Sequence, residues 1–256
     1  MAINRYFLEV MYKGTGFSGF QEQKNTPDTI QEALQSAFAT LTRQAVALTG
    51  SSRTDAGVHA LQNFFHFDYD GSFHPHLRYK MNAILPDGIT VTNIFAVPAD
   101  AHCRFNAIAR RYSYHIYRDK NPFLRDRAHY FPYPTNMALL QAAANHISGT
   151  HDFTAFSKRN TQVKTFTCTV TASQWMRLDG ELIYRVEANR FLRGMVRGLT
   201  GTMLQAGRGK MSLDEFKAVL AGKDCRQADF SVPGHGLFLE AVVYPPDLLL
   251  TPLDIR

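Results

Sequence analysis

Segments with the two-residue alternation of a half-buried β-strand recur along this chain, and amphipathic helical segments lie between them. The alternation predicts strands over 3–12, 45–49, 58–69, 89–97, 110–118, 163–175, 181–188 and 237–244. Apolar residues at helical spacing predict helices over 29–42, 76–84, 135–147, 191–206 and 212–221. Several strands follow one another in hairpin-like pairs, which favours antiparallel sheets with helices on one face. The sequence therefore predicts an α+β fold in two similar halves.

The 256 residues are enough for one large domain or for two domains of about 100–150 residues each. A boundary is expected near 98–105, because Pro98 ends a predicted strand and a basic segment begins shortly afterwards. We therefore expect an N-terminal domain over 1–103 and a C-terminal domain over 104–256.

The composition excludes several classes of protein. Hydrophobic residues make up 45% and charged residues 20%, as in globular proteins and unlike disordered chains. No apolar run is long enough to cross a bilayer, and 1–12 is typical of a strand rather than a signal peptide. Three widely spaced cysteines argue against a disulfide scaffold or a cysteine zinc site, and they favour a cytoplasmic location.

The net charge of +6 predicts a surface that attracts polyanions. Arginine outnumbers lysine by 19 to 9, and the basic residues gather in the segments 104–127 and 185–210. Guanidinium groups suit forked contacts to phosphate and stacking on bases, and aromatic residues lie among them. These features favour nucleic acid as the partner, although an ordinary solvated basic surface is the alternative.

The segment SSRTDAGVHA at 51–60 joins two predicted strands and carries Arg53 and Asp55. An aspartate two residues before a glycine is most simply a turn, with Gly57 at positive φ. The functional alternative is a carboxylate on a loop beside the sheet, acting as nucleophile or base in a cleft.

The predicted helix over 191–206 has an apolar stripe and an opposite basic face. The stripe consists of Leu192, Met195, Val196, Leu199 and Met203. The basic face carries Arg190, Arg193 and Arg197 among the glycines at 194, 198 and 201. A solvated basic face does not explain these glycines, since each costs about 1 kcal/mol relative to alanine in a helix. They are expected where another backbone, of protein or RNA, comes close.

In the strand over 110–118, Tyr112, Tyr114 and Ile116 share one face, and most of these residues are expected to pack in the sheet. A tyrosine facing a cleft could instead stack on a base. The histidine pairs 74/76 and 146/151 lack the spacing of metal ligands and are interpreted as turn or surface residues. Because no nucleotide-binding or metalloprotease motif occurs, we expect chemistry without a nucleotide cofactor or a metal.

Six segments in order resemble those of the tRNA pseudouridine synthase I family. They are YKGTGFSGFQEQ at 12–23, RTDAGVHA at 53–60, RFNAIARRYSY at 104–114, HDFTAF at 151–156, FLRGMVRGLTG at 191–201 and GHGLFLEAVVY at 234–244. RTDAGVHA is the specific signal among them. The chain departs from the family's usual residues at Lys13, Phe20, Ser52 and Cys103, where Asp, Trp, Gly and Ala are common.

The resemblance implies a pseudouridine synthase fold, with two halves like RRM or ferredoxin domains and a central cleft. It implies isomerisation of uridine to pseudouridine at positions 38–40 of tRNA, by a cytoplasmic homodimer without a cofactor. Asp55 would be the nucleophile, Arg197 its ion-pair partner, and Tyr112 would stack on the extruded uracil. The expected RNA contacts come from Tyr112, Arg53, Arg104, Arg111, Arg190 and Arg193.

Two other functions remain open from the sequence. One is a non-catalytic RNA-binding module with RRM-like sheets, in which Asp55 would have no chemical role. The other is a metal-dependent nuclease, although the nearby carboxylates Asp68, Asp70 and Glu187 have no instructive spacing.

Overall fold

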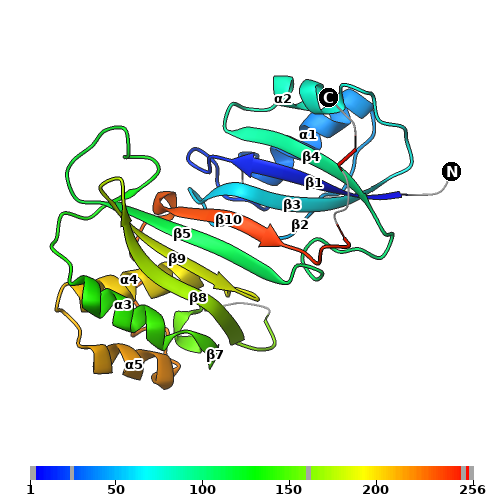
Figure 1. Cartoon of the computed structure of the whole chain (residues 1–256). Helices are drawn as coiled ribbons and strands as arrows, with labels where there is room; N and C mark the ends of the chain where they lie inside the picture. The colour runs from blue at the N-terminus through cyan, green and yellow to red at the C-terminus, as the bar shows by residue number, and fades with distance from the viewer. Residues whose placement is uncertain (1–3, 24–25, 160–162, 249–251, 254–256) are drawn as a thin grey trace. The chain divides into compact units, whose positions relative to one another are not determined.

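The computed structural model describes residues 4–23, 26–159, 163–248 and 252–253 (Figure 1). The chain forms two compact units, which we call unit 1 (Met1–Ile108 and Leu239–Arg256) and unit 2 (Ala109–Phe238). The division therefore falls after Ile108 rather than after residue 103, and the end of the chain returns to unit 1. One reason is a main-chain hydrogen bond of 2.8 Å, which the Ile108 N–H donates to the carbonyl of Val243.

Unit 1 is a mostly antiparallel sheet with two helices. Its strands are β1 (Asn4–Tyr12), β2 (Thr49–Gly50), β3 (His59–Tyr69), β4 (Ile89–Val97) and the part of β10 (Leu237–Val243) from Leu239 onward. They follow the order β4-β1-β3-β10, with β2 paired to β3. The helices are α1 (Ile30–Thr42) and α2 (Leu77–Ile84), which lie together beside the sheet (Figure 1). Residue 3 of the predicted strand over 3–12 lies outside the described residues.

The core of unit 1 is built on aromatic residues that α1 and β3 bring together. Phe38 of α1 is fully buried and meets the rings of Phe67 and Tyr69 edge-on, with centroids 5.1 and 5.4 Å apart. Such edge-to-face pairs add to the stabilisation from apolar burial. The helix begins where the Thr29 side chain accepts the N–H of Glu32.

Unit 2 repeats the combination of an antiparallel sheet with helices. Its main strands are β5 (Ala109–Tyr117), β7 (Gly149–Asp152), β8 (Thr167–Leu178) and β9 (Glu181–Ala188), in the order β5-β9-β8-β7. The helices α3 (Met137–His146), α4 (Met195–Gly207) and α5 (Leu213–Gly222) lie together on one side of this sheet (Figure 1). Two short 3₁₀ helices, η1 (Thr154–Phe156) and η2 (Gly234–Gly236), complete the unit.

The helices and strands confirm the predicted α+β class, and the differences are local. The strand predicted over 45–49 is reduced to β2, and the sequence prediction missed β6 (His129–Tyr130), which pairs in parallel with β5, and β7. Among the described residues, no helix combines the length and the apolar character needed to cross a membrane.

The start of α4 corrects one prediction. The helix begins at Met195 rather than at 191, because Gly194 has a φ of +74° and interrupts the helical backbone. Arg190 and Arg193 therefore precede the helix, and only Arg197 of the three predicted arginines lies on it. The burial of the five residues of the predicted apolar stripe is confirmed, although Leu192 lies before the helix and α4 is buried on other sides as well.

Two glycines within α4 are explained by the protein segment 229–230, which passes close to the helix. A Cβ atom added at Gly201 would lie 2.2 Å from the carbonyl oxygen of Asp229, and one at Gly198 would lie 2.7 Å from the Phe230 ring. The sequence left open whether protein or RNA comes close to these glycines. The close approach of protein accounts for both Gly198 and Gly201. The helix is thereby packed against the 229–230 segment.

Gly201→Ala is expected to lower the free energy of unfolding by about 1–3 kcal/mol, because the added methyl group overlaps the Asp229 carbonyl. Chemical denaturation measures this change. Gly222→Ala is the matched control, since a Cβ at Gly222, the last residue of α5, meets nothing within 4 Å. Equal stability of the two variants would contradict the close packing of α4 against the 229–230 segment.

Candidate active site

Asp55 lies in a tight turn that leads into β3. The Val58 N–H donates to the Asp55 carbonyl over 3.2 Å, and Gly57 has a φ of +78°, which confirms the predicted turn. The Asp55 side chain is half-buried, whereas Arg53 is exposed. The turn therefore holds a carboxylate partly shielded from water beside a solvent-facing guanidinium.

Buried hydrogen bonds fix the main chain just before Asp55. The hydroxyls of Tyr12 and Thr54 are 2.9 Å apart, and the Asn63 amide donates to the Tyr12 hydroxyl and to the Ser52 carbonyl. Tyr12, Thr54 and Asn63 are all buried. Because buried polar networks are rigid when satisfied, β1 and β3 together determine the position of this loop.

The segment after β1 supports the same loop from the other side. The Gly14 N–H donates to Nδ1 of His59 over 3.1 Å, and the Phe20 N–H donates to the Thr54 carbonyl over 3.1 Å. A Cβ atom at Gly14 would lie only 2.0 Å from the Val58 carbonyl oxygen. The motif at 12–23 is therefore the support for the RTDAGVHA loop, which explains why these two motifs occur together.

The hydroxyls of Ser51 and Ser52, just before Arg53, are buried and have no hydrogen-bond partner among the described protein groups.

A hollow of about 350 Å³ opens in unit 1 next to the RTDAGVHA loop. Its lining combines basic, aromatic and amide side chains with backbone: Phe20, Gln21, Gln31, Leu48, Thr49, Gly50, Arg53, His102, Arg104 and Phe105. The Arg104 guanidinium lies 5.7 Å from the centre of the Phe105 ring, which is 74% exposed. Positive charge beside an exposed ring suits a phosphate and a stacked base. Asp55 itself is not among the lining residues.

In unit 2 the tyrosines of β5 are packed in the core. The Tyr112 ring meets Phe191 edge-on at 5.1 Å between centroids and is 8% exposed. Tyr114 is fully buried and donates its hydroxyl to the Pro233 carbonyl. Burial raises the pKa of Tyr114 well above its usual range, and the charge of Arg197 opposes this shift. Tyr114 is therefore a neutral structural residue.

Arg197 is held in place by the segment that follows Asp229. Its Nε donates to the Val232 carbonyl over 2.8 Å, and its Nη2 lies 3.4 Å from the Phe230 carbonyl. The side chain is half-buried. Two carbonyl contacts on a planar group orient the guanidinium before any substrate arrives.

The other predicted RNA-contacting arginines differ in their surroundings. Arg111 pairs with Glu187 across β5 and β9 at 2.7 Å, so a carboxylate already neutralises its charge. Arg193 is exposed and Arg190 is partly exposed. The sequence analysis missed Arg110 as a structural residue: it is buried and donates to the Asn189 carbonyl.

The predicted site residues divide between the two units. Asp55, Arg53 and Arg104 belong to unit 1, whereas Tyr112, Arg111, Arg190, Arg193 and Arg197 belong to unit 2. The ion pair of Asp55 with Arg197 and the cleft between the halves stay predictions.

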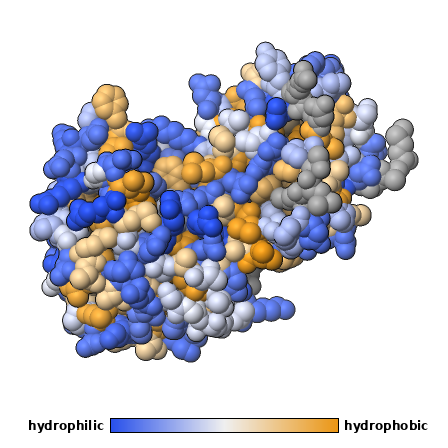
Figure 2. Space-filling model, in the orientation of Figure 1, coloured by the Kyte–Doolittle hydropathy of each residue, from blue (hydrophilic) through white to orange (hydrophobic). Residues whose placement is uncertain are grey.

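Hydrophilic residues cover much of the visible surface, with apolar residues scattered among them (Figure 2).

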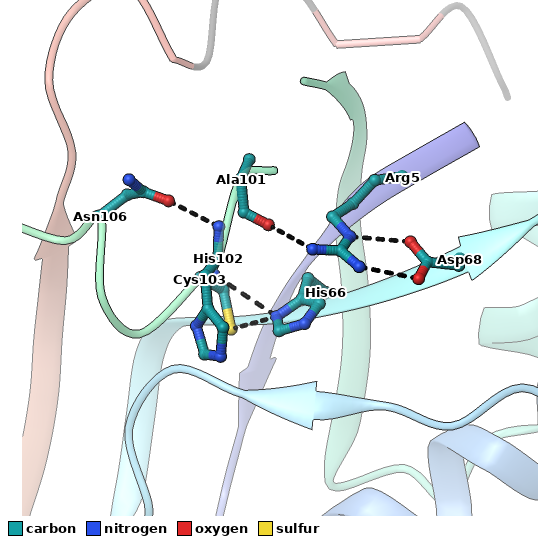
Figure 3. A network of polar contacts seen from close by, with 7 residues as sticks. All are labelled: Arg5, His66, Asp68, Ala101, His102, Cys103 and Asn106. Carbon is teal, nitrogen blue, oxygen red and sulfur yellow. Dashed lines mark hydrogen bonds and ion pairs between the residues drawn. The ribbon is translucent and has the colours of Figure 1, made fainter. Parts of the chain in front are cut away.

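A further cluster, which the sequence does not predict, brings β3 together with the loop after β4. His66, His102 and Cys103 place one potential metal ligand each within 4.8 Å of the others (Figure 3). Burial lowers the pKa of His66 to about 4, and the nearby charges of His102 and Arg5 act in the same direction. The sequence gives no signal for this cluster, because His66 and His102 are 36 positions apart and only the fold brings them together.

Comparison with known proteins identifies the class to which this α+β chain with an aspartate loop belongs. A family model described as tRNA pseudouridine synthase matches residues 9–106 and 143–245. Proteins named tRNA pseudouridine synthase A are 40% identical in Bacteroides fragilis and 38% in Porphyromonas gingivalis, each over at least 96% of this chain and 99% of the relative. The Bacillus subtilis protein of that name is 39% identical, over 92% of this chain and 97% of its own. The chain belongs to the tRNA pseudouridine synthase family.

Proposed function

We propose that this protein isomerises uridine to pseudouridine at positions 38–40 of the tRNA anticodon stem-loop. The observation that carries the proposal is the RTDAGVHA loop, with Asp55 half-buried on a turn that buried hydrogen bonds and the Gly14 contact hold in place. Membership of the family supports the reaction and its substrate class.

The reaction defines what the site must supply. The bond between ribose C1′ and uracil N1 breaks, the base turns while it stays bound, and a new bond forms between C1′ and C5. The proton on C5 is then lost and N1 gains one, so no atom enters or leaves overall. The base must leave the helical stack and be held away from water, at a cost of a few kcal/mol.

Asp55 is the nucleophile in this proposal. Its carboxylate adds to C6 of uracil or to C1′ of ribose, and in either case the covalent bond to the enzyme later breaks and regenerates the carboxylate. A rigid loop suits this role, because a covalent catalyst gains its advantage from being held at attack distance. The turn at 55–58 supplies that rigidity.

Arg197, Tyr112 and Arg53 take supporting roles. Arg197 pairs with Asp55 and favours the ionised carboxylate in the shielded site. Tyr112 stacks on the extruded uracil, and Arg53 contacts the RNA backbone beside the hollow that it lines. The carbonyls of Phe230 and Val232 hold Arg197 in orientation for its pairing.

Arginines distributed over both units provide the affinity for RNA. Arg104, Arg190 and Arg193 contact phosphates, whereas Arg111 contributes less because Glu187 already pairs with it. Phosphate contacts recognise the shape of the RNA rather than its sequence, and they make binding sensitive to salt. We further propose that the protein acts in the cytoplasm as a homodimer, with one tRNA contacting both copies.

The test is incubation of the purified protein with a uridine-labelled tRNA transcript in EDTA, followed by mapping of pseudouridine. Pseudouridine at positions 38–40, and its absence from a transcript with cytidine at those positions, is the expected result. Binding without isomerisation would favour the non-catalytic RNA-binding alternative. RNA cleavage that EDTA prevents would favour the nuclease alternative.

Arg197→Lys is expected to lower kcat by about tenfold or more, with a much smaller change in tRNA affinity. An ammonium group cannot hold the two carbonyls and a carboxylate in the geometry of a planar guanidinium. Single-turnover kinetics and binding titrations measure the two quantities. Arg226→Lys is the control, since Arg226 is exposed and pairs with Asp224. Unchanged kcat in Arg197→Lys would exclude the proposed pairing.

A further inference from the structure

The cluster of His66, His102 and Cys103 is built from two separate parts of unit 1. His66 lies on β3, and the two other residues lie in the loop after β4 (Figure 3). Nδ1 of His66 lies 3.2 Å from Sγ of Cys103, and the rings of His66 and His102 are 4.4 Å apart between centroids. Three ligand atoms from these residues lie within 4.8 Å of one another.

These distances are close to those that a zinc ion requires. Zinc bonds to imidazole nitrogen and to thiolate sulfur are about 2.0–2.3 Å long, so the ligand atoms of a tetrahedral site are about 3.3–3.8 Å apart. The separation of the His66 and Cys103 atoms, 3.2 Å, is within about 0.1 Å of this range, and small side-chain rotations would adjust the remaining distances. Thiolate and imidazole are the ligands that a soft divalent cation prefers over oxygen donors.

The surroundings allow the cluster to change from hydrogen bonding to metal binding. At present the Cys103 thiol donates to the Thr49 carbonyl over 3.0 Å, and Nδ1 of His102 accepts the N–H of Arg104. Binding a cation through Sγ of Cys103 and Nδ1 of His66 breaks the thiol's hydrogen bond and the 3.4 Å hydrogen bond that the Cys103 N–H donates to that nitrogen, and it releases the thiol proton to solvent. The loss of two neutral hydrogen bonds is small beside the formation of a metal–thiolate bond.

Access to the cluster also fits a cation. The guanidinium of Arg5 lies near the cluster, but its forked ion pair with Asp68, at 2.7 and 2.8 Å, neutralises it (Figure 3). Cys103 and His66 are buried, whereas His102 is partly exposed and lines the hollow of unit 1. A cation can therefore enter from the hollow, and water from the hollow can complete a fourth coordination position.

We infer that His66, His102 and Cys103 form a site for a soft divalent cation of the zinc type. The site has three protein ligands and an open fourth position toward the hollow. It is independent of the proposed isomerisation, in which no metal takes part. His102 lines the same hollow as Arg53 and Arg104. A cation at this site would therefore lie beside residues that are proposed to contact RNA.

The test is titration of the purified, reduced protein with Co²⁺, because a thiolate ligand gives an intense near-ultraviolet charge-transfer band. One equivalent of Co²⁺ is expected to produce this band, and Zn²⁺ is expected to abolish it by displacement. Cys103→Ala should lose the band, and His102→Ala should weaken Co²⁺ binding at least tenfold. Since His102 is partly exposed, His102→Ala remains informative if Cys103→Ala does not fold.

Cys225→Ser and Cys168→Ala are the matched controls, because each removes a thiol outside the cluster. Both are expected to keep the wild-type band and affinity. Absence of the band in the wild type would overturn the inference. Persistence of the band in folded Cys103→Ala, or unchanged affinity in His102→Ala, would overturn it as well.

Discussion

Asp55→Asn is expected to abolish pseudouridine formation, with a fall in rate of at least about 10³-fold, while tRNA binding stays within a few-fold of the wild type. An amide has nearly the same shape as the carboxylate but is not a nucleophile. The fold should be unaffected, because the main chain of residues 55–58 closes the turn. Rate measurements on labelled tRNA, together with filter binding, provide both quantities.

Asp28→Asn is a suitable control for that experiment. Asp28 is an exposed carboxylate just before α1, and no catalytic role is assigned to it. It should retain the full rate. If Asp55→Asn also formed pseudouridine at the wild-type rate, the nucleophile would have to be another group.

Gly14→Ala is expected to lower the rate by about 100-fold without any change to a reacting group. The added methyl group would lie 2.0 Å from the Val58 carbonyl oxygen, so the turn that carries Asp55 must move. A displacement of about 1 Å at a reacting group can cost a factor of this size. The free energy of unfolding should also fall, by about 1–3 kcal/mol.

Rates for Gly14→Ala are to be measured where circular dichroism shows that the variant is folded. This separates displacement of the loop from loss of folded protein. Gly222→Ala again serves as the control, because the same substitution there meets no neighbour. A wild-type rate in folded Gly14→Ala would show that contact with the 12–23 motif does not position Asp55.

The fold was largely predictable because local patterns and tertiary packing agree. The strands over 89–97 and 181–188 have their predicted bounds, and α1 lies within the predicted helix over 29–42. The strands that the sequence did not predict correctly have a different origin. The two-residue strand β6 has no periodicity to detect, and β2 is a strand because of its pairing with β3 rather than its own sequence.

The candidate site was predictable only where a motif is contiguous. The turn at Asp55 follows from its Asp-Ala-Gly sequence, and the burial of the α4 stripe follows from helical spacing. The start of α4 could not be predicted from helical spacing. Gly194 has a positive φ and Gly198 faces a ring, but nothing in the neighbouring sequence distinguishes the two glycines. The ion pair of Arg111 with Glu187 depends on strand register. The cluster of His66, His102 and Cys103 depends on β3 meeting the loop after β4.

The last strand also has a consequence for how this protein is made. Unit 1 contains the beginning of the chain and the residues from Leu239 onward, while all of unit 2 is synthesised in between. On the ribosome, unit 2 can complete its own sheet first, while β3 still waits for its neighbour β10. Until β10 has been synthesised and has left the ribosome, an open strand edge of the half that bears Asp55 is exposed to mispairing. Nascent chains that stall before this point would therefore depend on chaperones for protection.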